Sequence, residues 1–298
     1  MSGKVDSQFT FPTSSSKKIG RLVFLFTLCV YAMTAGGSMA TDIMTYEVTK
    51  SMVERQSVTM PYNLFGMEAH RGVDGQYYAP YGIGHALYSV PFYVVGRTVE
   101  SVLGGQIGRS DSLRKAAVAG GSTVVAAASV WLVFSFAWAL SGNLVSAVLT
   151  ALAFGFSTML WPYSKFGFNA PLATFCVVGG VYGVWVGGRS RRPLMVLCGG
   201  VGLGCAFLVR HELALVTVPV GCWLLLESGW DWRRALKSIA IVAIPVAAAL
   251  LVAAYYNHAR FGDPLDTGYL RDATAGFGSI WTGGWGLLVS PGGSVYLY

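Results

Sequence analysis

Long apolar runs, separated by short polar segments, make up most of this chain. Eight of them are long enough for helices in or on a membrane: 22–40, 81–98, 116–139, 144–163, 171–187, 193–209, 213–227 and 238–256. A transmembrane helix needs about 20 predominantly apolar residues, so most of these runs can cross a bilayer. The pattern predicts an all-α, polytopic membrane protein.

The composition agrees with this class, because 54% of the residues are hydrophobic and only 12% are charged, and the mean hydropathy is +0.54. The net charge of +7 comes from short basic clusters between apolar runs. Such clusters are typical of orientation signals and not of a phosphate-tracking surface, so we expect no nucleic-acid partner. The five cysteines lie inside apolar runs, without a CxxC pair or a histidine at ligand spacing, which disfavours disulfides and zinc.

The basic residues also predict how the chain crosses the membrane. The clusters Lys17–Arg21, Arg189–Arg192 and Arg233–Lys237 should all be cytoplasmic by the positive-inside rule. Five apolar runs separate the first two clusters, but only an even number of crossings keeps both of them inside. The run 81–98 contains a histidine, a proline and three tyrosines, so we expect it to form a helix on the outer surface instead of a span.

Seven spans follow from this assignment, with residues 1–20 as a disordered cytoplasmic tail and 21–298 as the transmembrane domain in the cell membrane. The segment 41–115 becomes one large outer loop that carries surface helices. Leu22–Ala40 also fits a cleavable secretory signal because small residues end it, but the many later spans make a retained first helix the simpler interpretation. Trp285–Tyr298 begins like a further span and is too short to cross, so it indicates either a truncated chain or an interfacial segment.

Four polar segments should meet at the outer face, namely 41–115, 161–169, 210–212 and 257–280. Asp42 is the most informative of their residues, because it directly follows the first apolar run. An ionisable group at the membrane edge is costly unless it has a partner or a function. We therefore predict a shared outer site built around Asp42.

Several motifs, taken in their order along the chain, resemble those of one enzyme family. Asp42–Glu54 resembles the start of the first outer loop in GT-C-type membrane glycosyltransferases, the protein O-mannosyltransferase-like group. Gly75–Gly84 is similar to that group's second loop element, an aromatic pair followed by a Pro/Gly turn. Trp161–Ser164, Leu208–Glu212 and Asn257–Tyr269 look like later landmarks of its bacterial members. The resemblance runs from about residue 22 to the end of the chain.

The resemblance implies transfer of a sugar from a polyprenyl-phosphate carrier to a glycan, lipid or protein acceptor at the outer face. It also implies an acidic general base in the first loop, and Asp42 occupies the matching position. A carboxylate can take the proton of an acceptor hydroxyl while the anomeric bond breaks, and direct attack predicts inversion. The departing lipid phosphate needs cationic partners, for which Arg210 and His211 are the candidates. An outer carboxylate could also hold a divalent metal ion, but no ligand set is visible in the sequence.

The carboxylates of the first loop also have a structural interpretation. Asp42 could cap a helix that begins near Met44, because aspartate is a preferred N-cap residue. Glu47 is a substrate-binding candidate, but Glu47, Lys50 and Glu54 fall at spacings that allow ion pairs of the two glutamates with Lys50 on the same expected helix.

The other candidates have similar alternatives. Asp74 and Tyr78 are further substrate-binding candidates, but the sequence around Asp74 has the composition of a tight turn, which is the favoured interpretation. Arg210 and Glu212 are close enough in sequence to neutralise each other. His85 is expected to be a packed or interfacial histidine and not a ligand.

A second class of function is a transporter or lipid-translocating protein with a gating outer loop, or a non-catalytic subunit of an envelope assembly. Transporters place binding residues near the bilayer midplane, often within internal repeats, whereas the polar residues here gather at one edge. The glycines of 179–188 and 200–204 lie in apolar runs without phosphate-loop residues, which predicts close helix packing.

Overall fold

The computed structural model describes residues 13–36, 40–60, 69–103, 111–229, 231–269, 271 and 279–289. These residues form helices and one short hairpin. The elements are α1 (Ser14–Met33), α2 (Ala40–Arg55), β1 (His70–Arg71), β2 (Tyr77–Tyr78), α3 (Ile83–Val102), α4 (Ser112–Ser141), α5 (Leu144–Phe156), α6 (Leu160–Ser164), α7 (Asn169–Arg189), α8 (Pro193–Val209), the 3₁₀ helix η2 (His211–Val216), α9 (Thr217–Glu227), α10 (Trp232–Phe261) and α11 (Ile280–Val289).

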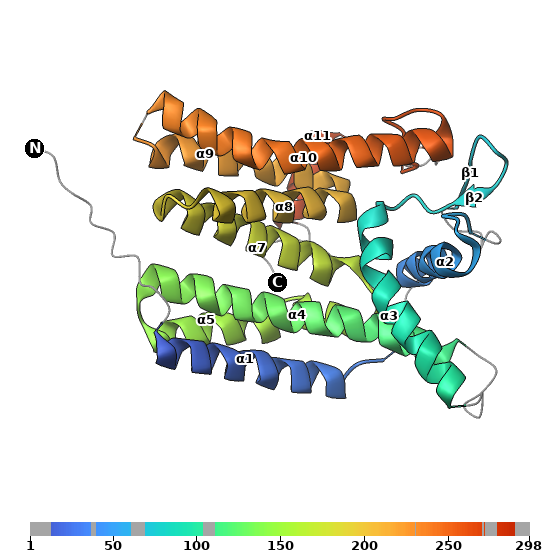
Figure 1. Ribbon diagram of the computed structural model, residues 1–298, viewed down its shortest axis with the longest axis horizontal. Coiled ribbons are helices and arrows are strands. Elements are labelled where there is room, and N and C mark those ends of the chain that lie inside the picture. Colours follow the sequence, from blue (N-terminus) through green and yellow to red (C-terminus); the bar gives the residue numbers. More distant parts are fainter. Residues whose placement is uncertain are drawn as a thin grey trace, which may run out of the picture.

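Most of the helices lie side by side in one elongated bundle (Figure 1). Helix α4 packs against α1, α5 and α7, and α8 packs between α7 and α10. Within the described part of the chain, α4, α7 and α10 are long and apolar enough to cross a membrane, and α5 and α8 are shorter apolar helices. The all-α prediction is therefore confirmed, and the bundle is a plausible polytopic membrane domain.

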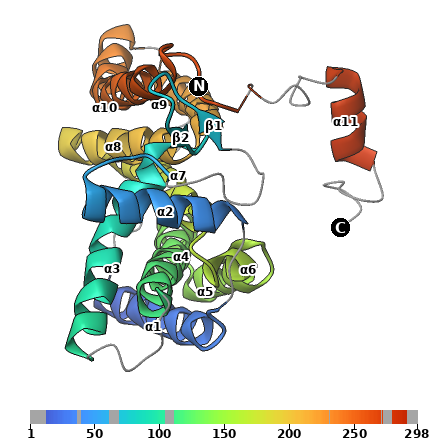
Figure 2. The same ribbon diagram turned by 90° about the vertical axis from the view of Figure 1, so that its right-hand side faces the viewer.

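A second layer lies across one end of the bundle (Figure 2). It consists of α2, α3 and the antiparallel hairpin β1–β2, in which His70 pairs with Tyr78. Helix α3 corresponds to the expected surface helix 81–98. It packs on α2 and α4 and, despite its 20 residues, is not among the helices apolar enough to span a membrane. Helix α11 lies apart from both layers, and residues 290–298, which include the rest of the expected last segment, lie outside the described residues.

Several helix boundaries differ from the expected ones. Helix α1 begins at Ser14, inside the expected tail 1–20, because the Thr13 hydroxyl caps it by accepting a hydrogen bond from the backbone of Ser16. The expected helix 144–163 is divided into α5 and α6. At the break, the Thr158 hydroxyl accepts a hydrogen bond from a backbone N–H, a local bond that competes with the helical ladder.

The glycine-rich runs pack as expected. A methyl group on Gly199 of α8 would lie 2.5 Å from the backbone nitrogen of Val184 on α7. On the other side of α8, one on Gly204 would lie 2.9 Å from the carbonyl oxygen of Pro245 on α10. Small residues thus allow three backbones to approach closely, as is common where helices pack in membranes.

Gly199→Ala is expected to lower the free energy of unfolding by about 1–3 kcal/mol, the usual effect of overpacking. The added methyl group would meet backbone atoms, which cannot move aside cheaply. The matched change Gly120→Ala, on α4, places a methyl group with nothing within 4 Å and should be neutral or stabilising. Thermal unfolding of both variants in one detergent checks this, and equal destabilisation would contradict the packing argument.

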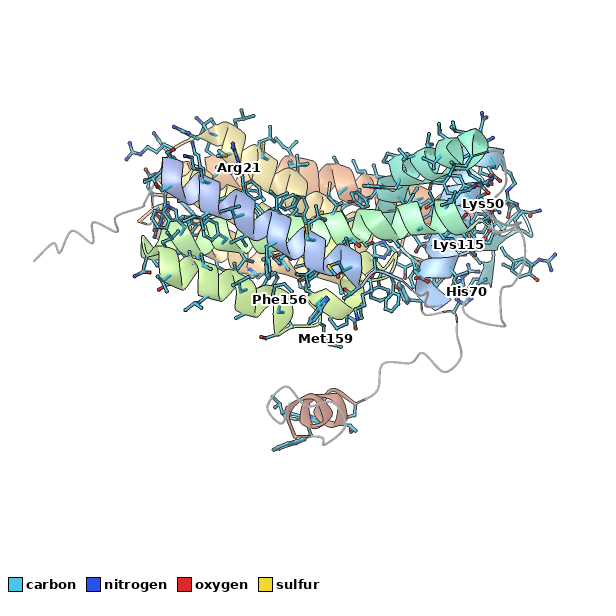
Figure 3. All side chains as sticks on the ribbon, turned by 90° about the horizontal axis from the view of Figure 1, so that it is seen from below. Arg21, Lys50, His70, Lys115, Phe156 and Met159 are labelled. Atoms are coloured by element: carbon cyan, nitrogen blue, oxygen red, sulfur yellow. The ribbon has the colours of Figure 1, made fainter. Side chains whose placement is uncertain are left out.

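The two ends of the bundle differ in charge. The basic end is formed by the first turns of α1, the α7–α8 turn and the first turns of α10, and it carries all three expected basic clusters (Figure 1). Among the described residues, its only acidic side chains are Glu227 and Asp231. The opposite end, called the loop end, carries the second layer and the remaining described acidic side chains. Figure 3 shows Arg21 at the basic end and Lys50, with Lys115, at the loop end.

Candidate active site at the loop end

A cavity of about 430 Å³ lies where α2 meets the bundle. Its walls come from the end of α1, the first turns of α2 and α4, and the connection between α6 and α7. Its lining includes four side chains with polar groups, Asp42, Tyr46, Ser112 and Lys115. The remaining lining is mostly alanine, glycine and valine, so the polar groups face an otherwise apolar space.

Asp42 lies in the first turn of α2 and is only 8% exposed. The expected N-cap role was wrong, because the helix begins at Ala40 and not near Met44. A carboxylate in the first turn is stabilised by the aligned peptide dipoles of the helix. Gly167 passes close by, since a methyl group there would lie 3.7 Å from the Asp42 Cβ atom. The α6–α7 connection therefore covers Asp42 without a side chain of its own at that point.

Lys115 supplies the positive charge of the cavity. Its ammonium group lies 5.4 Å from the centre of the Tyr46 ring, in a cation–π arrangement. Tyr46 itself is buried, and burial raises the pKa of its hydroxyl, which stays protonated. From the sequence, Lys115 was predicted only to mark the end of the outer loop. It belongs to the first turns of α4, and its place next to a long apolar run was the available signal.

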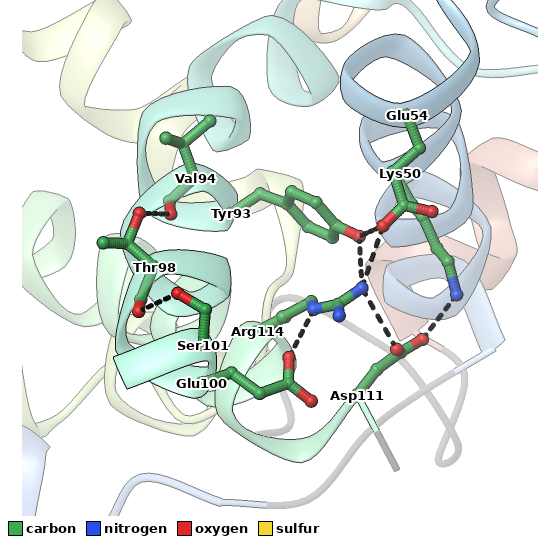
Figure 4. A network of polar contacts seen from close by, with 9 residues as sticks. All are labelled: Lys50, Glu54, Tyr93, Val94, Thr98, Glu100, Ser101, Asp111 and Arg114. Carbon is green, nitrogen blue, oxygen red and sulfur yellow. Dashed lines mark hydrogen bonds and ion pairs between the residues drawn. The ribbon is translucent and has the colours of Figure 1, made fainter. Parts of the chain in front are cut away.

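Ion pairs fix α2 against α3 and α4 (Figure 4). Lys50 Nζ lies 2.6 Å from Asp111 Oδ2. Arg114 Nη1 lies 2.8 Å from Glu54 Oε1, and the Tyr93 hydroxyl donates to the same oxygen over 2.7 Å. Burial opposes the charge of Asp111, but the hydrogen bond and charge of Lys50 outweigh it and lower the pKa of Asp111. The network thus holds the two helices that contribute the charged groups of the cavity.

Glu47 is half-buried on α2 and is not part of the cavity lining. The ion pairs that were expected within this helix run to α4 instead, from Lys50 to Asp111 and from Glu54 to Arg114. These groups are 20% to 30% exposed, so both pairs lie at the partly buried contact between the two helices.

Asp74 lies in a tight turn, and Tyr78 supports this turn through a hydrogen bond. The Asp74 carboxylate accepts hydrogen bonds from the backbone N–H of Gln76 and, over 2.8 Å, from the Tyr78 hydroxyl. Burial, followed by this hydrogen bond, raises the pKa of Tyr78 to about 12. Gly75 has a φ of +79°, which suits glycine in a tight turn. The turn expected at Asp74 is confirmed, and neither residue lines the Asp42 cavity.

Arg210 and His211 also lie at the loop end but do not line the described walls of that cavity. Arg210 Nε lies 2.9 Å from Glu212 Oε1, so these two charges pair with each other. His211 packs beside the Phe207 ring, and burial, with the charge of Arg260, lowers its pKa. The cationic group that shares a cavity with Asp42 is Lys115 and not the expected basic pair.

Arg260, near the end of α10, is a buried structural residue of the loop end that was not predicted from the sequence. Its side chain is fully buried and donates hydrogen bonds to the Ala79 carbonyl oxygen and, over 2.7 Å, to Asn257 Oδ1. The Tyr256 ring lies 3.8 Å from its guanidinium carbon. The Arg260 carbonyl oxygen also accepts a hydrogen bond from Val73. Arg260 thereby anchors the hairpin region to the bundle. Its presence inside the motif Asn257–Tyr269 was the only sequence signal.

His85 is packed in the interior of the loop end, as expected. It is 2% exposed, and neither ring nitrogen has a hydrogen-bond partner among the described residues. Burial lowers the pKa of His85 from 6.5 to about 4. The folded protein therefore holds this imidazole neutral at pH values where the unfolded chain binds a proton.

This difference predicts an acid-dependent loss of stability. The His85 contribution is fully present above pH 6.5 and is lost as the pH falls toward 4, by about 3 kcal/mol in total. His85→Leu should flatten the melting temperature against pH in this window, while the exposed His258→Gln should leave the slope unchanged. A slope that is the same for His85→Leu and the unmodified protein would contradict the buried neutral state.

No group of three or more His, Cys, Asp or Glu side chains that could hold a metal ion occurs among the described residues. Comparisons with known protein families, with curated proteins and with solved structures find no match.

Proposed function

We propose that this protein is a GT-C-type membrane glycosyltransferase that moves a sugar from a polyprenyl-phosphate carrier to an outer-face envelope acceptor. The observation that carries the proposal is the cavity of about 430 Å³, which joins the buried Asp42 carboxylate of α2 to the Lys115 ammonium of α4. The two groups have opposite charge and face one mostly apolar space, which suits a lipid-linked substrate with an anionic leaving group.

Asp42 acts as the general base in this proposal. The hydroxyl oxygen of the acceptor attacks the anomeric carbon, the bond from that carbon to the phosphate oxygen breaks, and the hydroxyl proton passes to the Asp42 carboxylate. The configuration at the anomeric carbon is inverted because the attack is direct. The polyprenyl phosphate leaves with the electron pair of the broken bond.

Lys115 stabilises the leaving phosphate. Its ammonium group is the cationic group on the described walls of the cavity, and the network of α2, α3 and α4 holds its helix in place. Arg210 is less suited to this role, because Glu212 already neutralises it at 2.9 Å. Asp74, with Tyr78, supports the hairpin and has no direct role in transfer.

The orientation that fits this function places the basic end in the cytoplasm and the loop end outside. The seven spans are then α1, α4, α5 (together with α6), α7, α8, α9 (together with η2) and α10. The support is that all three basic clusters lie at one end, where the described acidic residues are only Glu227 and Asp231. In this orientation the Asp42 cavity lies at the outer edge of the bilayer.

Cysteine labelling tests the orientation. In a chain freed of its native cysteines, Asp263→Cys at the loop end should react with a membrane-impermeant maleimide added to intact cells. Ser141→Cys, exposed at the basic end, should react only after the membrane is opened. The opposite pattern would invert the molecule and place Asp42 in the cytoplasm.

The transfer reaction is tested with a panel of polyprenyl-phosphate sugars in membranes that contain the folded protein and an endogenous acceptor fraction. Sugar that moves from one donor into the acceptor fraction, and only in membranes with this protein, supports the proposal. Failure with every donor and acceptor fraction, at confirmed folding, contradicts it.

A further inference from the structure

A second cavity, of about 350 Å³, lies at the basic end between the α7–α8 turn and the first turns of α10. Three cationic side chains line it, Arg191, Arg234 and Lys237. The first turn of α8 also reaches it through Pro193. The three cations make the cavity suited to a negatively charged group.

The charges of this cavity are not neutralised by described acidic groups. Asp231 is its one acidic lining residue, and its carboxylate caps α10 by accepting hydrogen bonds from Arg233 and Arg234 backbone N–H groups. Glu227, the other described acidic residue at this end, lies 3.3 Å from Arg189. Among the described residues, no carboxylate lies within ion-pair distance of the three cationic side chains of the cavity.

The backbone of the α7–α8 turn points to the same conclusion. Arg191 has a φ of +53°, a left-handed conformation in which glycine is favoured and long side chains are uncommon. An arginine at such a position is locally unfavourable, and here its side chain contributes a charge to the cavity. The backbone conformation of Arg191 is therefore slightly unfavourable, while its side chain contributes to the charged lining of the cavity.

The cationic face of α10 continues into an exposed apolar one. Positions three and four residues apart follow one stripe of the helix, so Arg234 and Lys237 are followed by Ile241, Ile244 and Leu251. Ile244 is 67% exposed and Leu251 is 72% exposed. In a membrane this stripe faces lipid chains, directly beyond the cations. A ligand with a phosphate at one end and a hydrocarbon chain at the other matches both parts.

We propose that the cavity of Arg191, Arg234 and Lys237 binds the phosphate headgroup of an anionic phospholipid, with an acyl chain along the exposed apolar stripe of α10. Basic pockets between membrane helices are suited to such headgroups, and each cation near the surface of an anionic bilayer adds to the attraction. This inference is independent of the transfer reaction, since the two cavities lie at opposite ends of the bundle.

The test is binding of phosphatidylglycerol to the purified full chain in detergent, measured by native mass spectrometry. The pocket variant is R191Q/R234Q/K237Q. The matched control is K18Q/R192Q/R233Q, which removes three exposed charges at the same end that do not line the cavity. We expect the pocket variant to bind at least about tenfold more weakly, and the control to bind as the unmodified protein does. The melting temperature without lipid shows that both variants are folded.

Two further probes separate the lipid from a free phosphate. Phosphatidylcholine, which has no net charge, should bind more weakly than phosphatidylglycerol. Glycerol phosphate, which has the headgroup chemistry without acyl chains, should not compete at equal concentration. An equal loss of phosphatidylglycerol binding in both variants would mean that the effect comes from the total positive charge of this end, and it would overturn the proposal. Equal binding of the two lipids, or full competition by glycerol phosphate, would overturn it as well.

Discussion

Asp42→Asn is expected to lower kcat for sugar transfer by about 10²–10⁴-fold, the usual contribution of a general base. The amide keeps the size of the side chain and its place in the first turn of α2, but it cannot take a proton from the acceptor hydroxyl. The binding of the polyprenyl-phosphate donor should change little, because in the proposed reaction its phosphate contacts Lys115 and not Asp42. Initial rates at saturating donor, with protein amounts matched in the membrane, measure this effect.

Two control variants sharpen this result. Glu47→Gln removes a carboxylate from the same helix, outside the cavity, and should retain activity. Lys115→Gln should raise KM for the donor and slow the departure of the phosphate leaving group, because it removes the cation on the described walls of the cavity. Full activity of Asp42→Asn would exclude it as the base, and a loss in Glu47→Gln equal to that in Asp42→Asn would point to a general effect on α2.

Arg260→Ala is expected to lower the free energy of unfolding by about 3–5 kcal/mol, as removal of a large buried group with polar partners usually does. The change leaves the Ala79 carbonyl oxygen and the Asn257 side chain without their donor and opens a space beside Tyr256. The hairpin β1–β2 should then be cleaved faster by proteases than in the unmodified protein. Thermal unfolding and limited proteolysis in detergent measure the two effects.

Arg271→Ala provides the comparison. Arg271 also lies against the hairpin region, and its Nε atom lies 2.6 Å from Asp266 Oδ2, but the two side chains are 34% and 23% exposed. Pairs with this exposure contribute only about 0–1 kcal/mol. An effect of Arg271→Ala as large as that of Arg260→Ala would mean that the hairpin is held by surface charge and not by the buried guanidinium.

Much of the helical architecture could be predicted from the sequence, because the helices of such a bundle need long apolar runs, and these runs are visible in the sequence. The run 193–209 coincides with α8, and the run 81–98 corresponds to α3, which is not among the helices apolar enough to span. The break between α5 and α6 could not be predicted in this way. At this break the Thr158 hydroxyl donates to the Phe154 carbonyl oxygen and accepts from the Leu160 N–H, and hydropathy does not register such local hydrogen bonds.

The candidate site was predicted only in part. Asp42 could be singled out because a carboxylate beside an apolar run is locally unusual. Lys115 and Arg260 could not, because their roles depend on contacts between distant segments. Arg260 reaches Ala79, 181 positions away, and the pair that fixes α2 to α4 joins Lys50 to Asp111 across 61 positions. Such contacts leave no periodic signal in one sequence.

The close packing of α7 on α8 has a consequence for the biogenesis of the protein. The two helices are joined by only three residues, 190–192, and glycines bring their backbones close, with the side chains of Val184, Val196 and Leu203 packed between them. The pair can therefore assemble as a hairpin as soon as α8 leaves the ribosome. Helix α10 packs on the opposite face of α8 and is made later. During synthesis, α7 and α8 can thus pack first, and α10 can then be added to the outer face of this pair.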